Sequence, residues 1–164
     1  MYAILISDFT AFSATTVGSP GTLVDSQLFL FDGAGNGLIA NNDAAAATLQ
    51  SAIPSGSPLL TALPSGVYYL LLDSSGRDPV SGGGAIFPTG GSTSSLLGPT
   101  GPGGGQPLTG YIGAGSGTGT YVITLTGASF AQAAAPEPGT AALGLAAIGS
   151  LVGMGGLRRR CRVS

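Results

Sequence analysis

Residues 27–40 read QLFLFDGAGNGLIA, two apolar runs separated by a turn rich in Gly. The first run carries two Leu and two Phe, and such residues between turn signals are typical of β-strands. The glycines and Asn36 tolerate the positive φ angles that tight turns require. The segment therefore predicts a β-hairpin, with strands at residues 27–31 and 38–40 and the turn at residues 32–37.

Further apolar runs between turn signals predict more strands. They lie at residues 3–6, 59–63, 67–73 and 121–126. The runs at 59–63 and 67–73 are separated only by Pro64-Ser65-Gly66, a turn sequence, so they are expected to pair with each other.

Two segments are expected to be something other than strands. Asp43 can cap a short helix through residues 44–52, because its side chain can accept a hydrogen bond from the first helical turn. Residues 74–105 are dominated by Gly, Ser and Pro, with one apolar island at residues 85–87. That composition predicts a long loop.

The overall composition agrees with a β-rich body. The chain of 164 residues contains 30 Gly and 11 Pro, which are both unfavourable in helix interiors. Its length suits one domain with appendages. We therefore expect an all-β fold over residues 1–127, an antiparallel β-sandwich of jelly-roll-like form with long Gly/Ser/Pro loops.

Charge is distributed unevenly along the chain. Residues 1–135 contain six Asp and one Arg, a net charge of −5, whereas the last seven residues contain four Arg. A body this acidic repels phosphate backbones, which argues against binding to nucleic acid.

Residues 140–157 read TAALGLAAIGSLVGMGGL and carry no charged side chain. A helix of 18 residues is about 27 Å long, close to the thickness of the hydrocarbon core of a bilayer. A buried amphipathic helix is the alternative, but the segment has no polar face. The sequence thus predicts one transmembrane helix.

A basic tail, residues 158–164, follows this segment directly. Its arginines are Arg158, Arg159, Arg160 and Arg162. The positive-inside tendency places them on the cytoplasmic side of the membrane, with the body on the opposite side.

A linker, residues 128–139, precedes the apolar segment and ends in Pro136-Glu137-Pro138-Gly139. The two prolines restrict φ and push the preceding residues toward extended conformations. An extended, accessible peptide next to the membrane suits a protease or transpeptidase.

Residues 136–162 resemble the PEP-CTERM sorting signal of Gram-negative bacteria. The resemblance rests on Pro-Glu-Pro followed by Gly-Thr, then a small-residue apolar segment, then the arginine cluster. It implies processing by an exosortase, a membrane-embedded cysteine transpeptidase, at or beside Pro136, Glu137 and Pro138. It also implies an inner-membrane intermediate and a final location at the cell surface or in the extracellular matrix.

Export also requires a targeting segment at the start of a chain. The apolar run at Tyr2–Ile6 has five residues and no preceding Lys or Arg, whereas signal peptides have 7–15 apolar residues. We therefore expect either a misassigned start codon or a gene fragment.

The body resembles β-sandwich modules related to the bacterial pre-peptidase C-terminal (PPC) domain. The matching segments lie within residues 22–126, at 24–32, 41–43, 63–70 and 119–125. The opening strands of the family pattern are missing, which also suggests truncation. The resemblance implies an accessory or adhesive role without catalysis.

The residue types limit the possible chemistry. The chain has no His, and its one Cys, Cys161, lies beyond the apolar segment. Ser/His/Asp and Cys/His nucleophilic sites and the usual zinc sites are therefore excluded. A carboxylate pair could hydrolyse glycosides, but Asp is common at turns and strand ends for local hydrogen bonding. We expect no enzyme activity.

Oxygen-bearing side chains gather around the predicted hairpin and could bind calcium, which prefers six to eight oxygen ligands. The candidate ligands are Asp25, Asp32, Asn36, Asn41 and Asp43, with Asn42 beside them. Asp and Asn are also ordinary turn residues, so turn formation is the alternative role.

Taken together, these features predict a non-enzymatic surface or matrix protein that an exosortase processes. Its expected partners are the exosortase, membrane lipid and extracellular polysaccharide, as in a biofilm. A calcium-dependent carbohydrate- or protein-binding module and a gene fragment are the alternatives.

Overall fold

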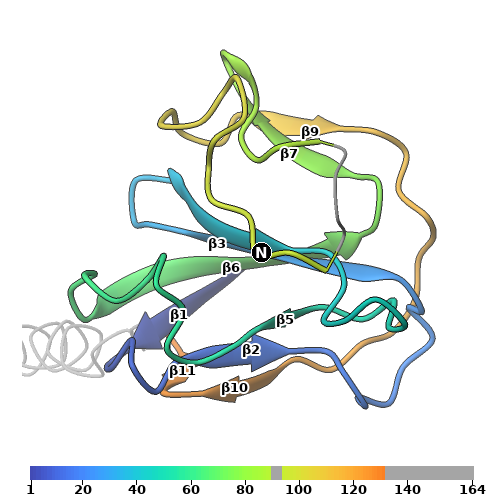
Figure 1. Cartoon of the computed structure of the whole chain (residues 1–164), viewed down its shortest axis with the longest axis horizontal. Coiled ribbons are helices and arrows are strands. Elements are labelled where there is room, and N and C mark those ends of the chain that lie inside the picture. The colour runs from blue at the N-terminus through green and yellow to red at the C-terminus, as the bar shows by residue number, and fades with distance from the viewer. Residues whose placement is uncertain (90–93, 132–164) are drawn as a thin grey trace, which may run out of the picture. The chain divides into compact units, whose positions relative to one another are not determined.

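The computed structural model describes residues 1–89 and 94–131, which form eleven β-strands and no helix within those ranges (Figure 1). All of their pairings are antiparallel. The strands are β1 (Tyr2–Ile6), β2 (Ser13–Thr15), β3 (Ser26–Phe31), β4 (Gly37–Asn41), β5 (Ala52–Ile53), β6 (Gly66–Ser74), β7 (Asp78–Ser81), β8 (Gly84–Ala85), β9 (Gly110–Ile112), β10 (Thr124–Thr126) and β11 (Ala128–Phe130). The expected all-β, antiparallel character is confirmed.

A five-stranded sheet in the order β11-β1-β6-β3-β4 forms the centre of the body. The predicted hairpin is confirmed as β3 and β4, which pair with Leu28 opposite Asn41 and Leu30 opposite Ile39. The strands expected at residues 3–6 and 67–73 are confirmed as β1 and β6. β6 is the longest strand and pairs with both β1 and β3.

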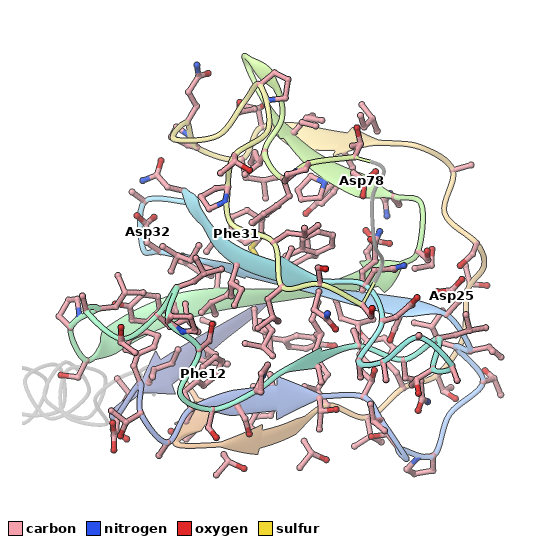
Figure 2. The ribbon with its side chains drawn as sticks, viewed as in Figure 1. Phe12, Asp25, Phe31, Asp32 and Asp78 are labelled. Atoms are coloured by element: carbon pink, nitrogen blue, oxygen red, sulfur yellow. The ribbon has the colours of Figure 1, made fainter. Side chains whose placement is uncertain are left out.

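Apolar clusters cover both faces of the central sheet at its middle strands, where alternate residues of a strand point to opposite faces. β3 shows this most clearly, since all six of its residues are buried. Leu28 and Leu30 belong to one apolar cluster, and Phe29 and Phe31 belong to another. Figure 2 shows Phe12 and Phe31 on opposite sides of the sheet.

The larger cluster packs the central sheet against a three-stranded sheet, β10-β2-β5. Phe12, Ala14 and Ile53 contribute from the smaller sheet and the segment before it, opposite central-sheet residues such as Ile4 and Leu70. In Figure 1 this smaller sheet lies below β3 and β6.

The second cluster covers the other face with residues that flank a third sheet, β8-β7-β9, and none of its members lies within those three strands. Ile86 and Phe87 follow β8 directly and are buried against Phe29 and Phe31. The ring centroids of Phe87 and Phe29 lie 5.5 Å apart. Figure 1 shows β7 and β9 on the opposite side of the central sheet from β2 and β10.

The prediction of a long loop over residues 74–105 is wrong in its first part, where β7 and β8 form, whereas residues 86–89 and 94–105 contain no strand. The apolar island at residues 85–87 anchors the segment, and glycines let neighbouring backbones approach closely. The amides of Gly101 and Gly103 donate to the carbonyls of Ile86 and Ala85, at 3.0 and 2.8 Å.

Two further local predictions are wrong. Residues 44–50 form turns and bends instead of a helix, with the amide of Ala44 donating to the carbonyl of Gln50 at 2.7 Å, and Ala52 begins β5. A short alanine-rich helix is marginal without an apolar face to bury. Residues 59–63 form turns that place Leu60 in the core, so β6 pairs with β1 and β3 instead.

At its carboxyl end the described body extends further than the expected boundary at residue 127. The strand expected at residues 121–126 is shorter, β10 at Thr124–Thr126, and β11 then pairs with β1. Gly127 lies between them and lets the chain pass from one sheet to the other.

No helix in the described residues is long and apolar enough to cross a membrane. The predicted transmembrane helix at residues 140–157 and the basic tail at 158–164 lie outside the described residues, as does the linker from residue 132 onward.

Candidate functional site

Asp32 and Asn36 form the turn of the β3–β4 hairpin. Asp32 Oδ1 accepts hydrogen bonds from the backbone amides of Ala34 and Asn36 at 2.9 and 2.8 Å, and its Oδ2 accepts from Asn36 Nδ2 at 2.9 Å. Desolvation acts to raise the pKa of Asp32, but the hydrogen bonds from Asn36 and the turn amides outweigh it and lower the pKa. This carboxylate stabilises the turn.

Asn41 holds the chain where β4 ends. Its Nδ2 donates to the carbonyls of Asp43 and Ser95 at 3.0 and 3.4 Å, and its Oδ1 accepts from the amide of Ala52 at 2.8 Å. The residue is 2% exposed. Asn41 thus satisfies buried backbone groups at the point where the chain turns toward β5.

Asp25 and Asp43 differ from these residues because part of each carboxylate has no partner. Asp25 Oδ1 and Asp43 Oδ1 are buried without a hydrogen bond among the described residues, and so is Oδ1 of Asn42. Burial raises the pKa of Asp25, the negative charge of Asp43 raises it further, and a hydrogen bond from Ser75 opposes the change. The two carboxylates therefore repel each other.

The five candidate calcium ligands are divided between the two ends of the hairpin. Asp25 precedes β3 and Asp32 follows it, and Figure 2 shows them at opposite ends of that strand. Seven residues of extended chain span roughly 20 Å, too far for one ion to contact both side chains. The fold brings Asp25, Asn41 and Asp43 to one end, and Asp32 and Asn36 to the other.

The described residues contain no group of three or more His, Cys, Asp or Glu that could hold a metal ion. A cation near Asp25 and Asp43 would therefore need amide or backbone carbonyl oxygens as well. Asn42 supplies such an amide oxygen. The feature of the sequence that points to Asn42 as a ligand is its position next to Asp43.

A second polar group attaches the β8-β7-β9 sheet to the central sheet. Arg77 forms an ion pair with Asp73 at 3.3 Å and lies over the ring of Tyr111, 4.7 Å from its centroid. Burial raises the pKa of Asp78, a hydrogen bond from Gln27 opposes this, and the charge of Asp73 adds to it. Sequence patterns did not single out these residues.

The sorting residues predicted from the sequence lie outside the described residues. They are Pro136, Glu137, Pro138 and Gly139, with Arg158, Arg159, Arg160 and Arg162. Their assignment therefore rests on the order of residues in the chain.

Comparison with protein families gives one match for the chain. Residues 134–160 match the PEP-CTERM protein-sorting motif. No curated protein and no solved structure matches the chain. The motif implies an exported protein that passes through a membrane-anchored intermediate in a Gram-negative bacterium and is processed by an exosortase.

Proposed function

We propose that this chain is a non-enzymatic surface or matrix protein whose β-body is delivered by its carboxyl-terminal tail. The single observation that carries the proposal is the PEP-CTERM motif at residues 134–160. Each part of the tail has a separate physical task in this proposal.

In the proposed pathway, residues 140–157 span the inner membrane as a helix, because unpaired backbone groups are costly in lipid. The arginines at 158–160 and 162 hold the cytoplasmic end, and the body lies on the far side. Pro136-Glu137-Pro138 is then an extended substrate for the exosortase at the membrane surface. Processing releases or transfers the body to the cell surface or the polysaccharide matrix.

The roles of the carboxylates support a body without catalysis. Asp32 is engaged in the hairpin turn, and Asp73 pairs with Arg77. Asp8 accepts hydrogen bonds from the amide and hydroxyl of Thr10, at 2.8 and 2.7 Å. These carboxylates stabilise turns and sheet contacts, as Asp commonly does.

The proposal includes a body of the PPC-like sandwich type with an additional sheet. The packing of the central sheet against β10-β2-β5 through one apolar cluster supports a sandwich. The β8-β7-β9 sheet would be the addition, attached to the opposite face of the central sheet through Ile86 and Phe87, which follow β8.

The test is a sorting assay on the full chain, expressed behind a cleavable signal peptide with different epitope tags at the two ends. In cells with an exosortase, the wild type should lose its carboxyl-terminal tag while the body leaves the inner membrane. A variant with Pro136, Glu137 and Pro138 replaced by Ala should keep both tags in the inner membrane.

A matched control replaces Pro54 and Pro58 by Ala, which removes prolines from the body and leaves the tail unchanged. This control should be processed like the wild type. Identical processing of the triple variant, or processing of the wild type in cells that lack the exosortase, would contradict the proposal.

A calcium-dependent carbohydrate- or protein-binding module is the second candidate function. The buried unpaired oxygens of Asp25, Asn42 and Asp43 favour it. Calorimetric titration of the protein with polysaccharide should show binding only when calcium is present, and binding in a chelator would contradict this candidate.

A further inference from the structure

Among the described residues, four buried side-chain oxygen or nitrogen atoms have no hydrogen-bond partner. They are Asp25 Oδ1, Asn42 Oδ1, Asp43 Oδ1 and Ser57 Oγ. Three of the four come from two short segments, one just before β3 and one just after β4. We call Asp25 Oδ1, Asn42 Oδ1 and Asp43 Oδ1 the three unpaired oxygens.

The strand register brings these two segments to the same end of the hairpin. β3 and β4 are antiparallel with Leu28 opposite Asn41, so the residues before Leu28 and after Asn41 extend in the same direction. The amide of Ser26 donates to the carbonyl of Leu49 at 3.0 Å, which ties the start of β3 to the loop that follows Asp43.

The charges at this end of the hairpin are not balanced by the body itself. Asp43 is only 7% exposed, and the negative charges of Asp25 and Asp43 repel each other. The one Lys or Arg in residues 1–131 is Arg77, whose guanidinium pairs with Asp73 and stacks on Tyr111. A buried carboxylate oxygen without a donor or a counter-charge is costly, so an external cation would stabilise the arrangement.

We infer that Asp25, Asn42 and Asp43 bind a divalent cation, and that the cation is calcium. Carboxylate and amide oxygens are hard ligands that calcium accepts in flexible geometry, whereas zinc prefers the thiolates and imidazoles that this body lacks. Backbone carbonyls and water would complete the six to eight ligands. Asp32, Asn36 and Asn41 are not ligands in this assignment, because their side-chain groups already serve the turn and the bend.

The expected affinity is that of an extracellular module. Two carboxylates and one amide are a small ligand set, which suits a Kd on the order of 10⁻⁴ to 10⁻³ M. The cation would join the start of β3 to the segment between β4 and β5. Occupancy of a site with this Kd rests on the proposed export, since calcium reaches such concentrations only outside the cytosol.

The experiment measures the Tm of the full chain in detergent micelles, with calcium chloride, magnesium chloride or sodium chloride at matched ionic strength. Calcium at about 10 mM should raise the Tm by roughly 3–8 °C, because a ligand that binds only the folded state stabilises it by mass action. Magnesium should raise it less, since it requires a stricter octahedral geometry.

The variants Asp25→Asn and Asp43→Asn should lose most of the calcium response. In a chelator, both should be more stable than the wild type, because each substitution removes the repulsion between the carboxylates. That combination distinguishes a cation site from a simple structural role, in which the substitutions would only destabilise.

Asp32→Asn is the matched control at the other end of the hairpin, and it should keep the full calcium response. The inference would be overturned by a wild type without a calcium-specific rise in Tm, or by a doubly substituted protein that still responds. An equal response to magnesium would overturn the choice of calcium. Because no step involves the exosortase, this result is independent of the sorting assay.

Discussion

At the residue scale, the Asp and Asn side chains of the hairpin differ in which donors reach them. Asp32 accepts hydrogen bonds from backbone amides of its own turn, and Asn41 pairs with the backbone of Asp43, Ser95 and Ala52. Asp25 and Asp43 each keep one buried oxygen without a hydrogen-bond partner in the described part of the chain. Residues of the same type thus have a turn role, a bracing role and a proposed ligand role within one hairpin.

Asp78 provides a pH-dependent prediction at this scale. Burial raises its folded-state pKa, so its contribution to stability is fully present below the unfolded pKa of about 3.9 and is lost as the pH rises through the folded pKa. Asp78→Asn removes this ionisation. The variant should therefore gain stability over the wild type as the pH rises from about 4 to 7.

Urea unfolding of both proteins across that pH range, in the same detergent, gives the free energies of unfolding. A difference between the two proteins that stays constant with pH would show that Asp78 does not titrate as its burial implies.

At the element scale, the change of sheet between β10 and β11 depends on the backbone of Gly127. Its φ is +66°, and a Cβ at this position would lie 2.7 Å from the amide nitrogen of Phe12. The glycine therefore meets two requirements, a left-handed conformation and close approach to the chain that leads into β2. β10 can then pair with β2 while β11 pairs with β1.

Gly127→Ala should destabilise the body more than Gly56→Ala. Gly56 has a similar φ of +69°, and a Cβ added there would have no atom within 4 Å, so its substitution costs only the left-handed strain of about 1–2 kcal/mol. Gly127→Ala should cost about 1–3 kcal/mol more, because a crowded site must shift.

Chemical unfolding of the two variants measures this difference. Equal losses of stability would mean that the corner at Gly127 relaxes freely and does not set the path of the chain.

At the scale of the whole body, two apolar clusters share the central sheet. One packs against β10-β2-β5, and the other packs against segments that flank the β8-β7-β9 sheet, where Ile86 and Phe87 lie. Losing either cluster exposes one face of β3 and β6 to water, so the two clusters should stabilise the fold together.

Phe87→Ala tests whether the second cluster is an integral part of the fold. Phe87 is 4% exposed and contacts the rings of Phe29 and Phe31, so its truncation should cost about 3–5 kcal/mol. Phe130→Ala is the control, because Phe130 is 55% exposed at the sheet edge and should cost about 1 kcal/mol or less.

Circular dichroism during denaturation reports both stabilities. If Phe87→Ala costs as little as Phe130→Ala, the β8-β7-β9 sheet is peripheral and the central sheet is stable without it.

Local sequence was sufficient for the features that depend on neighbouring residues. The hairpin of β3 and β4 follows from two apolar runs around a turn. In that turn the Asp32 carboxylate accepts a hydrogen bond from a backbone amide of the same turn. The sorting motif was equally readable, because a linear order of Pro-Glu-Pro, apolar residues and arginines defines it.

The sequence by itself determined the β-rich, antiparallel character of the body and the PEP-CTERM motif, since both are written in residues close together in the chain. Tertiary structure decided the rest: that Ile86 and Phe87 fill a second core, that residues 44–52 are not helical, and which carboxylate oxygens lack a donor among residues 1–89 and 94–131. The physical reason is that burial and hydrogen-bond satisfaction depend on groups brought together from distant segments, such as Ser26 with Leu49.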